Sequence, residues 1–232
     1  MESPRHTNAV ARGFTLVELI VVLVIIIIIT TITITSQTNY NRSLIITNTA
    51  YTVALSIREA QSLGLSSRNF SGVQNAGYGI NFQDTLTAQY RIFADIQSTP
   101  AYSGCPTGTV NTPEAKPGNC LYDSVSEILT TFNLNKGFRI HDFCGLRTSN
   151  NSRVCGSHSS WTSMNITFLR PNTEAIMTMI TTTNAAAPLK CAVIWIAPPS
   201  GTVANMKCIV VSQVGQVSVP QTCPAASFTT CP

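Results

Sequence analysis

The chain has 232 residues, enough for one globular domain with an appendage, and 44% of them are hydrophobic, which excludes a disordered chain. Only 10% are Asp, Glu, Lys or Arg, against about 25% in ordinary globular domains, so hydroxyl and amide groups must make much of the surface polar. A surface of this kind is suited to an exported protein.

An apolar segment near the N-terminus predicts a membrane span. It runs from Phe14 to Ile34, 21 residues that are apolar except for Glu18 and several threonines, and it includes eleven consecutive aliphatic residues from Leu19 to Ile29. At about 1.5 Å per residue, a helix of this length crosses the hydrocarbon core of a bilayer, which is about 30 Å thick. We therefore expect one transmembrane helix.

The flanking charges predict the orientation of this helix. Arg5 and Arg12 precede it, against the single acid Glu2, so the N-terminus is expected in the cytoplasm and the chain after Tyr40 outside. A cleaved secretory signal is the alternative, but the apolar stretch is too long and no A-x-A site follows it. A targeting segment also has no need for a charge such as Glu18, which is costly in a membrane.

The string GFTLVE at residues 13 to 18, after a short basic leader and before a long aliphatic run, resembles the class III signal of type IV prepilins and type II secretion pseudopilins. The resemblance implies that a prepilin peptidase cuts between Gly13 and Phe14 and N-methylates Phe14. Residues 1–13 would then be a removed leader, and residues 14–36 a retained transmembrane and assembly helix.

Glu18 has a specific role if this resemblance holds. Cleavage creates an α-ammonium group on Phe14, and Glu18 of an adjacent subunit is expected to neutralise it when subunits pack helix against helix. The desolvation of two charges is offset only when they meet in the correct register, so the pair would direct assembly. The alternative is a glutamate that lies at the headgroup boundary and has no partner.

Residues 37–66 predict a helical continuation, because residues 40–63 lack Gly and Pro. We expect it to be amphipathic and to pack on a sheet through one stripe, and to end at Gly64. The stripe is expected to contain Leu44, Asn48, Tyr51, Leu55 and Ser62, and to be widened by Ile45, Val53, Ile57 and Ala60.

Residues 67–232 are expected to form an extracytoplasmic, β-rich domain with disulfide-stapled loops. Short runs rich in Ile, Val, Phe and Tyr alternate with polar turns, which favours an antiparallel sheet over βαβ units. The fold class is therefore α+β, a long N-terminal helix packed on an antiparallel sheet, as in the pilin fold. The phrases YGINF, YRIFAD and IVVSQVGQVSV are similar to strands of the H-type pseudopilin and related minor pilins. The expected strands are 78–82, 89–94, 128–132, 138–140, 164–169, 175–180, 192–196 and 207–213.

Eight cysteines, all in the C-terminal half, indicate disulfides in an oxidising compartment. Cys105 with Cys120 would close an irregular Pro- and Gly-rich insert, and Cys144 with Cys155 would hold the next loop. The other four allow three pairings. If a hairpin joins their strands through PPSGTVAN, Cys191 and Cys208 are too far apart to bond. The four cysteines of unassigned pairing are Cys191, Cys208, Cys223 and Cys231.

Neither a metal site nor a catalytic site is expected. His141, Cys144, Cys155 and His158 have loosely ligand-like spacing, but the chain has no CxxC, and two histidines beside a disulfide are the simpler interpretation. The motifs of common hydrolases and nucleotide-binding proteins are absent. A triad of His141, Asp142 and Ser157, Ser159 or Ser160 carries almost no information, because serine is so common here. We expect no enzyme and no cofactor.

The sequence predicts a minor pilin or pseudopilin, a non-enzymatic filament subunit in the bacterial inner membrane with a periplasmic domain. Its expected partners are other pilins or pseudopilins, the prepilin peptidase and the inner-membrane assembly platform. A membrane-anchored binding module is one alternative. Another is a DNA-binding minor pilin of an uptake filament, whose phosphate contacts would come from Arg139, Arg147, Arg153, Arg170, Lys190 and Lys207.

Overall fold

The computed structural model describes residues 13–66, 68–99, 102, 104–105, 118–156, 160–199, 205–225 and 227–232. The chain divides into two compact units, Met1–Ser43 and Leu44–Pro232. The expected leader, residues 1–13, lies outside the described residues except for Gly13.

One helix, α1 (Leu16–Leu65), supplies the helical part of both units. In the first unit it carries the apolar segment Leu16–Ile34, which is long and apolar enough to cross a membrane. In the second unit, Gly64 packs so closely on Phe168 that a Cβ would overlap the Phe168 carbonyl. Gly64 is therefore required by the close approach of the helix to the sheet, as well as lying near the end of the helix.

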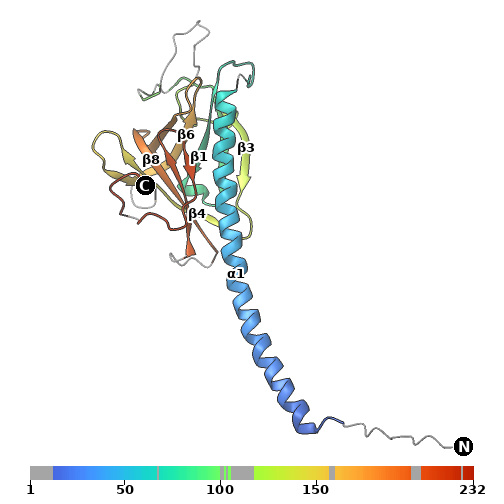
Figure 1. Cartoon of the computed structure of the whole chain (residues 1–232). Coiled ribbons are helices and arrows are strands. Elements are labelled where there is room, and N and C mark those ends of the chain that lie inside the picture. Colours follow the sequence, from blue (N-terminus) through green and yellow to red (C-terminus); the bar gives the residue numbers. More distant parts are fainter. Residues whose placement is uncertain are drawn as a thin grey trace, which may run out of the picture. The chain divides into compact units, whose positions relative to one another are not determined.

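The second unit contains one curled antiparallel sheet, and α1 lies against one of its faces (Figure 1). The strand order is β10-β9-β8-β7-β6-β1-β2-β3, and β4 pairs with both β8 and β5. The strands are β1 (Gly77–Gln83), β2 (Gln89–Asp95), β3 (Ile128–Asn133), β4 (Arg139–Arg147), β5 (Arg153–Cys155), β6 (Trp161–Phe168), β7 (Ala175–Thr181), β8 (Ala186–Ala197), β9 (Lys207–Ser212) and β10 (Val217–Ser218); two short 3-10 helices are η1 (Asp84–Leu86) and η2 (Val125–Glu127).

The expected α+β class, with an N-terminal apolar helix and an antiparallel sheet, is confirmed. Every expected run forms a strand, and β10 lies in the phrase IVVSQVGQVSV that resembled strands. However, β5 was not predicted, and β4 continues to Arg147 instead of ending near Ile140. The continuation HDFCGLR has no apolar alternation. It is extended because its backbone pairs with β8 on one side and with β5 on the other.

The main core lies between α1 and the sheet. From α1 it contains Ile46, Ala50, Val53, Ile57 and Ala60, all buried. The small residues at positions 50 and 60 allow the helix backbone to approach the strands closely. Large side chains of the sheet fill the space opposite them, among them Ile80, Phe82, Tyr90, Ile92, Met164, Ile166, Phe168, Met177 and Ile194.

The expected packing stripe of α1 is wrong. Tyr51 is 52% exposed and Leu55 62% exposed, and Leu44 also faces solvent. Val53, Ile57 and Ala60, which were expected only to widen the stripe, lie on the buried face. Periodicity could not choose between the faces, because both carry apolar residues and the helix is therefore not simply amphipathic.

A pair of truncations on α1 tests this correction. Ile57→Ala should lower the free energy of unfolding by about 2–5 kcal/mol, because it opens a cavity in the core. Leu55→Ala should change it by less than about 0.5 kcal/mol, because that side chain contacts mainly solvent. Trp161 and Trp195 fluorescence during urea unfolding of the detergent-solubilised chain measures both. Equal losses would contradict the assigned faces.

Candidate functional site

The candidate site in the first unit is the start of α1. Gly13, Phe14 and Thr15 precede the helix, and Phe14 is 81% exposed. Within the described part, no atom beyond its chain neighbours lies within 4 Å of the position that a Cβ on Gly13 would take. The Gly13–Phe14 peptide bond therefore lies outside the helix, between two exposed residues.

Thr15 caps the helix, and Glu18 takes part in that cap. The Glu18 backbone N–H donates to Thr15 Oγ1 at 3.3 Å, and the Leu19 N–H donates to the Thr15 carbonyl at 3.2 Å. Thr15 is thus the N-cap residue and Glu18 the N3 residue, and the bond between them comes from the Glu18 backbone. Sequence reasoning missed this local role, although the pattern T-x-x-E before an apolar run could have found it.

Electrostatics makes the first turn a site for a carboxylate. The N-terminal end of a helix carries a partial positive charge, so an acid there is stabilised and a cation is disfavoured. Glu18 is the one formal charge in Leu16–Ile34, and it lies in the first turn of α1.

Three threonines at the end of the aliphatic run donate their hydroxyl groups to backbone carbonyls of the same helix. Thr30 donates to the Ile26 carbonyl at 2.6 Å, Thr31 to Ile27 at 2.7 Å and Thr33 to Ile29 at 2.8 Å. These i to i−4 bonds remove the need for an outside partner, so the hydroxyls are compatible with an apolar environment.

In the second unit all eight cysteines are paired. Cys105 bonds Cys120 and Cys144 bonds Cys155, the two pairs expected from the sequence. In the β8–β9 ladder, Cys191 lies opposite Ser212 and Cys208 opposite Trp195, so these two cysteines are separated along the ladder and do not pair. The remaining bonds join Cys191 to Cys231 and Cys208 to Cys223.

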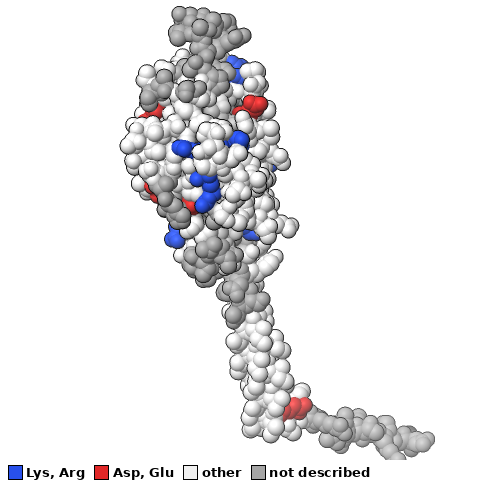
Figure 2. All heavy atoms as spheres, turned by 90° about the vertical axis from the view of Figure 1, so that its left-hand side faces the viewer, with Lys and Arg blue, Asp and Glu red and all other residues white. Residues whose placement is uncertain are grey.

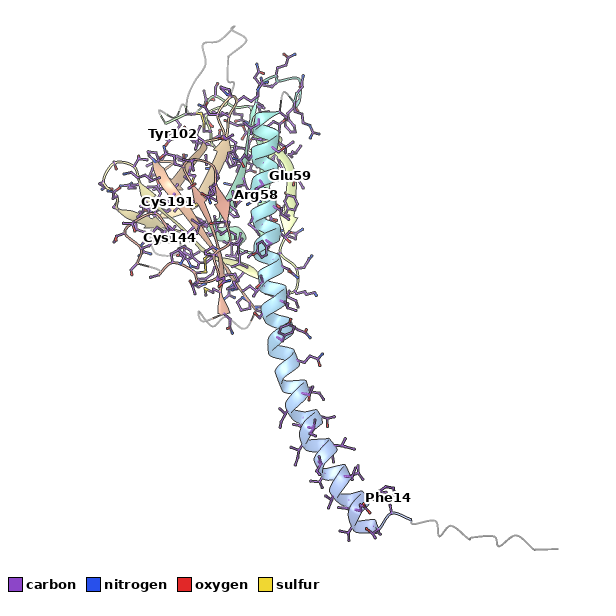
Figure 3. All side chains as sticks on the ribbon, viewed as in Figure 1. Phe14, Arg58, Glu59, Tyr102, Cys144 and Cys191 are labelled. Atoms are coloured by element: carbon purple, nitrogen blue, oxygen red, sulfur yellow. A yellow bond between two sulfur atoms is a disulfide. The ribbon has the colours of Figure 1, made fainter. Side chains whose placement is uncertain are left out.

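The last two disulfides hold the C-terminal segment over the sheet face away from α1, the side on which Cys144 and Cys191 lie (Figure 3). There Phe228 packs against Trp195, with ring centroids 6.2 Å apart. Leu146, Val193 and Val210 belong to the same buried cluster. The face that lacks a helix is therefore covered by irregular chain, which explains its dependence on disulfides.

Two buried carboxyl groups hold the chain around Cys120. Asp95 accepts hydrogen bonds from the backbone N–H groups of Asn119 at 2.9 Å and Cys120 at 2.7 Å. Glu127 accepts from three backbone N–H groups, those of Ile96, Gln97 and Asp123, at 2.9–3.1 Å. Sequence reasoning did not identify this pair, because two isolated acids give no sign of being buried.

The pKa of Asp95 is raised to about 8. Burial is the main cause, since the side chain is completely enclosed, and the nearby charges of Glu127 and Asp123 raise the pKa further. The hydrogen bonds from Cys120 and Asn119 act in the opposite direction but are outweighed. Both carboxyl groups accept hydrogen bonds from backbone N–H groups, so their role in this arrangement is to hold the loops around Cys120 in place.

The zinc alternative loses two of its ligands. Cys144 and Cys155 are joined to each other, so neither offers a thiolate. His158 lies outside the described residues. Two clusters of titratable groups in the described part have metal-like spacing, one with Asp95 and one with Asp142, but each consists otherwise of a disulfide.

The residues considered for a serine triad are described only in part, and Ser160, which is described, is exposed. Asp142 accepts a hydrogen bond from the backbone N–H of Phe143 at 2.8 Å, and His141 is exposed on β4. Ser157 and Ser159 lie outside the described residues.

The basic side chains considered for DNA are mostly engaged within the domain. Arg147 lies over the Trp161 ring at 5.0 Å, and Arg170 donates to Asn75. Lys190 Nζ donates to Asn151 at 2.7 Å and Lys207 Nζ to the Gln221 carbonyl at 3.2 Å. Arg153 Nη1 lies 3.2 Å from Cys155 Sγ, and Arg139 is exposed. Figure 2 shows the side of the molecule that is on the left in Figure 1, where Lys and Arg groups have acidic groups among them.

Comparison with known proteins identifies no relative. No model of a protein family matches the chain, and neither a curated protein nor a solved structure matches it.

Proposed function

We propose that this chain is a minor pilin or pseudopilin, a non-enzymatic subunit of a type IV pilus or a type II secretion pseudopilus. The observation that carries the proposal is the start of α1. An exposed Gly13–Phe14 bond lies directly before a capped helix whose apolar segment Leu16–Ile34 contains Glu18 as its one charge. A prepilin peptidase would cut this bond and methylate the new Phe14 amine.

The helix geometry supports a pairing of that amine with a carboxylate. Cleavage would leave an ammonium group at the positive end of α1, where it is unfavourable. Glu18 of a neighbouring subunit would neutralise it in a low-dielectric environment, and the two desolvated charges would hold the subunits in one register. Partners in this scheme are other pilins or pseudopilins and the inner-membrane assembly platform.

The second unit supports an extracytoplasmic location. Four disulfides close loops and hold the C-terminal segment, and such bonds persist in oxidising compartments such as the periplasm. With Leu16–Ile34 in the inner membrane and the N-terminus in the cytoplasm, the domain lies on the periplasmic side. A long helix against an antiparallel sheet is also the arrangement of the pilin fold.

Mass spectrometry of the chain purified from membranes tests the proposal. The mature protein should begin at N-methylated Phe14. Gly13→Val should remain uncut, because a β-branched side chain obstructs the backbone at the scissile bond. Ala9→Val, which leaves Gly13 in place, should be cut like the native chain. A native-length Gly13→Val mature chain, or a mature chain that begins after Ser36, would overturn the proposal.

A further inference from the structure

The solvent-facing side of α1 in the second unit carries an apolar stripe that the domain does not use. We call Leu44, Asn48, Tyr51 and Leu55 the outer stripe; all four are exposed. At the ~100° per residue of an α-helix they lie within about 60° of one another, opposite the buried face of Ile46, Val53, Ile57 and Ala60. Large apolar side chains concentrated in this way mark an interaction surface.

The spacing within the outer stripe fits a helix as its partner. Successive members are four, three and four residues apart, which is the repeat that keeps one seam facing a neighbouring helix in a left-handed pair. No charged residue occurs from Ser43 to Ile57. Asn48 lies in the middle of the seam, and a single polar residue at such a position sets the register of a helix pair.

Two opposite charges flank the far end of the stripe. Arg58 and Glu59 follow Leu55 within about one turn of the helix. At ~100° per residue they lie on opposite sides of the outer stripe, each about 50° around the helix from the centre line of the stripe. Both are exposed, and Arg58 Nη2 donates to the Val217 carbonyl at 2.9 Å, which fixes the guanidinium on its own side (Figure 3). A parallel two-fold pair would place each Arg58 beside the Glu59 of the other copy.

We propose that the outer stripe binds the same stripe of a second copy of this chain, as a parallel pair of helices at equal height. The orientation rests on the proposed function, because two copies anchored through Leu16–Ile34 in one membrane have parallel helices. In this pair the two Asn48 amides hydrogen-bond each other, Tyr51 and Leu55 exclude water, and two Arg58–Glu59 pairs close the seam. Equal height then brings identical residues together.

Single cysteines test the pair in the full chain reconstituted in lipid bilayers. Because the native protein has no free thiol, an introduced cysteine is the only reactive one. Leu55→Cys and Leu44→Cys should give cross-linked dimers on mild oxidation. Thr52→Cys is a matched control, exposed on the same helix, whose copies would lie on opposite outer sides of the pair. Cross-linking that is equal at all three positions, or absent at positions 44 and 55, would overturn the proposal.

A charge exchange tests the flanks. Glu59→Arg should weaken dimerisation about tenfold, equivalent to about 1.4 kcal/mol, because two attractive pairs become two repulsive ones. The double variant Arg58→Glu with Glu59→Arg should restore it, since the pairs are then reversed but still opposite. Sedimentation of detergent-solubilised chain measures both. Failure of the double variant to recover, with the fold intact by circular dichroism, would contradict the arrangement.

The uncut Gly13→Val chain separates this inference from the proposed function. It keeps the outer stripe, so it should still cross-link through Leu55→Cys even though it does not enter a filament. Cross-linking without processing or filament incorporation of the native chain would leave the pair standing and remove the pilin function. Normal processing and incorporation without cross-linking would remove the helix pair and leave the pilin function standing.

Discussion

Glu18→Ala and Glu18→Gln should both be inserted in the membrane and cut after Gly13, and both should be lost from filament fractions. Removing the carboxylate leaves the Phe14 amine of a neighbour desolvated and unpaired. Breaking a desolvated ion pair costs about 3–5 kcal/mol, so incorporation should fall roughly a hundredfold or more. Insertion should not suffer, because loss of a charge lowers the cost of the span.

Both substitutions leave the helix cap in place, because the bond to Thr15 Oγ1 comes from the backbone N–H of residue 18 and not from its side chain. If the charge of Glu18 had no role in assembly, both variants would therefore behave like the native chain. Neutralisation of the amine requires the charge, so it predicts equal defects.

Sheared filament or pseudopilus fractions, compared with inner-membrane fractions at matched expression, measure incorporation. Thr33→Ala is a control in the same helix that removes a hydroxyl already satisfied by the Ile29 carbonyl. It should assemble normally. Equal recovery of Glu18→Gln and the native chain would show that the charge does not direct assembly.

Asp95→Asn should lower the stability of the second unit by an amount that depends on pH. The amide can accept from only one of the two backbone donors, so its NH₂ group would oppose the other N–H, either that of Asn119 or that of Cys120. Leaving such buried groups unpaired costs about 1–3 kcal/mol. At pH 4 the variant should therefore unfold at lower urea than the native chain.

The pH dependence follows from the raised pKa of Asp95. Its value of about 8 in the folded state exceeds the ordinary value near 3.8, so the folded state binds the proton more tightly. The contribution to stability is fully present below pH 3.8 and is lost as the pH rises through 8. The native chain should lose on the order of 2–5 kcal/mol over that range, and Asp95→Asn should lose little.

Urea unfolding followed by tryptophan fluorescence at several pH values, with disulfides intact, measures this difference. Asp84→Asn is the control, because Asp84 is exposed in η1 and its loss should change stability by less than about 0.5 kcal/mol. The difference in the free energy of unfolding between the native chain and Asp95→Asn should become smaller as the pH rises toward 8. A constant difference would mean that Asp95 does not titrate in this range.

The sequence by itself determined the α+β class, the apolar helix and the strands with clear alternation. These features depend on local patterns: a long aliphatic run from Leu19 to Ile29 forms a helix in an apolar environment, and period-two runs form strands in almost any antiparallel sheet. The short loops closed by Cys105–Cys120 and Cys144–Cys155 were also predictable, because nearby cysteines meet at low entropic cost.

Only the tertiary structure decided which face of α1 is buried. Both faces carry apolar residues. Ile57 packs in the core between α1 and the sheet and Leu55 does not, and the spacing of apolar residues along the helix cannot show which of the two fits there. It also decided the bonds Cys191–Cys231 and Cys208–Cys223 and the burial of Asp95 and Glu127. Cys191 and Cys231 are 40 residues apart, so they meet only once the C-terminal segment covers the sheet. Cys208 and Cys223 are only 15 apart, but Cys208 could be assigned to this partner only after the β8–β9 ladder had separated it from Cys191.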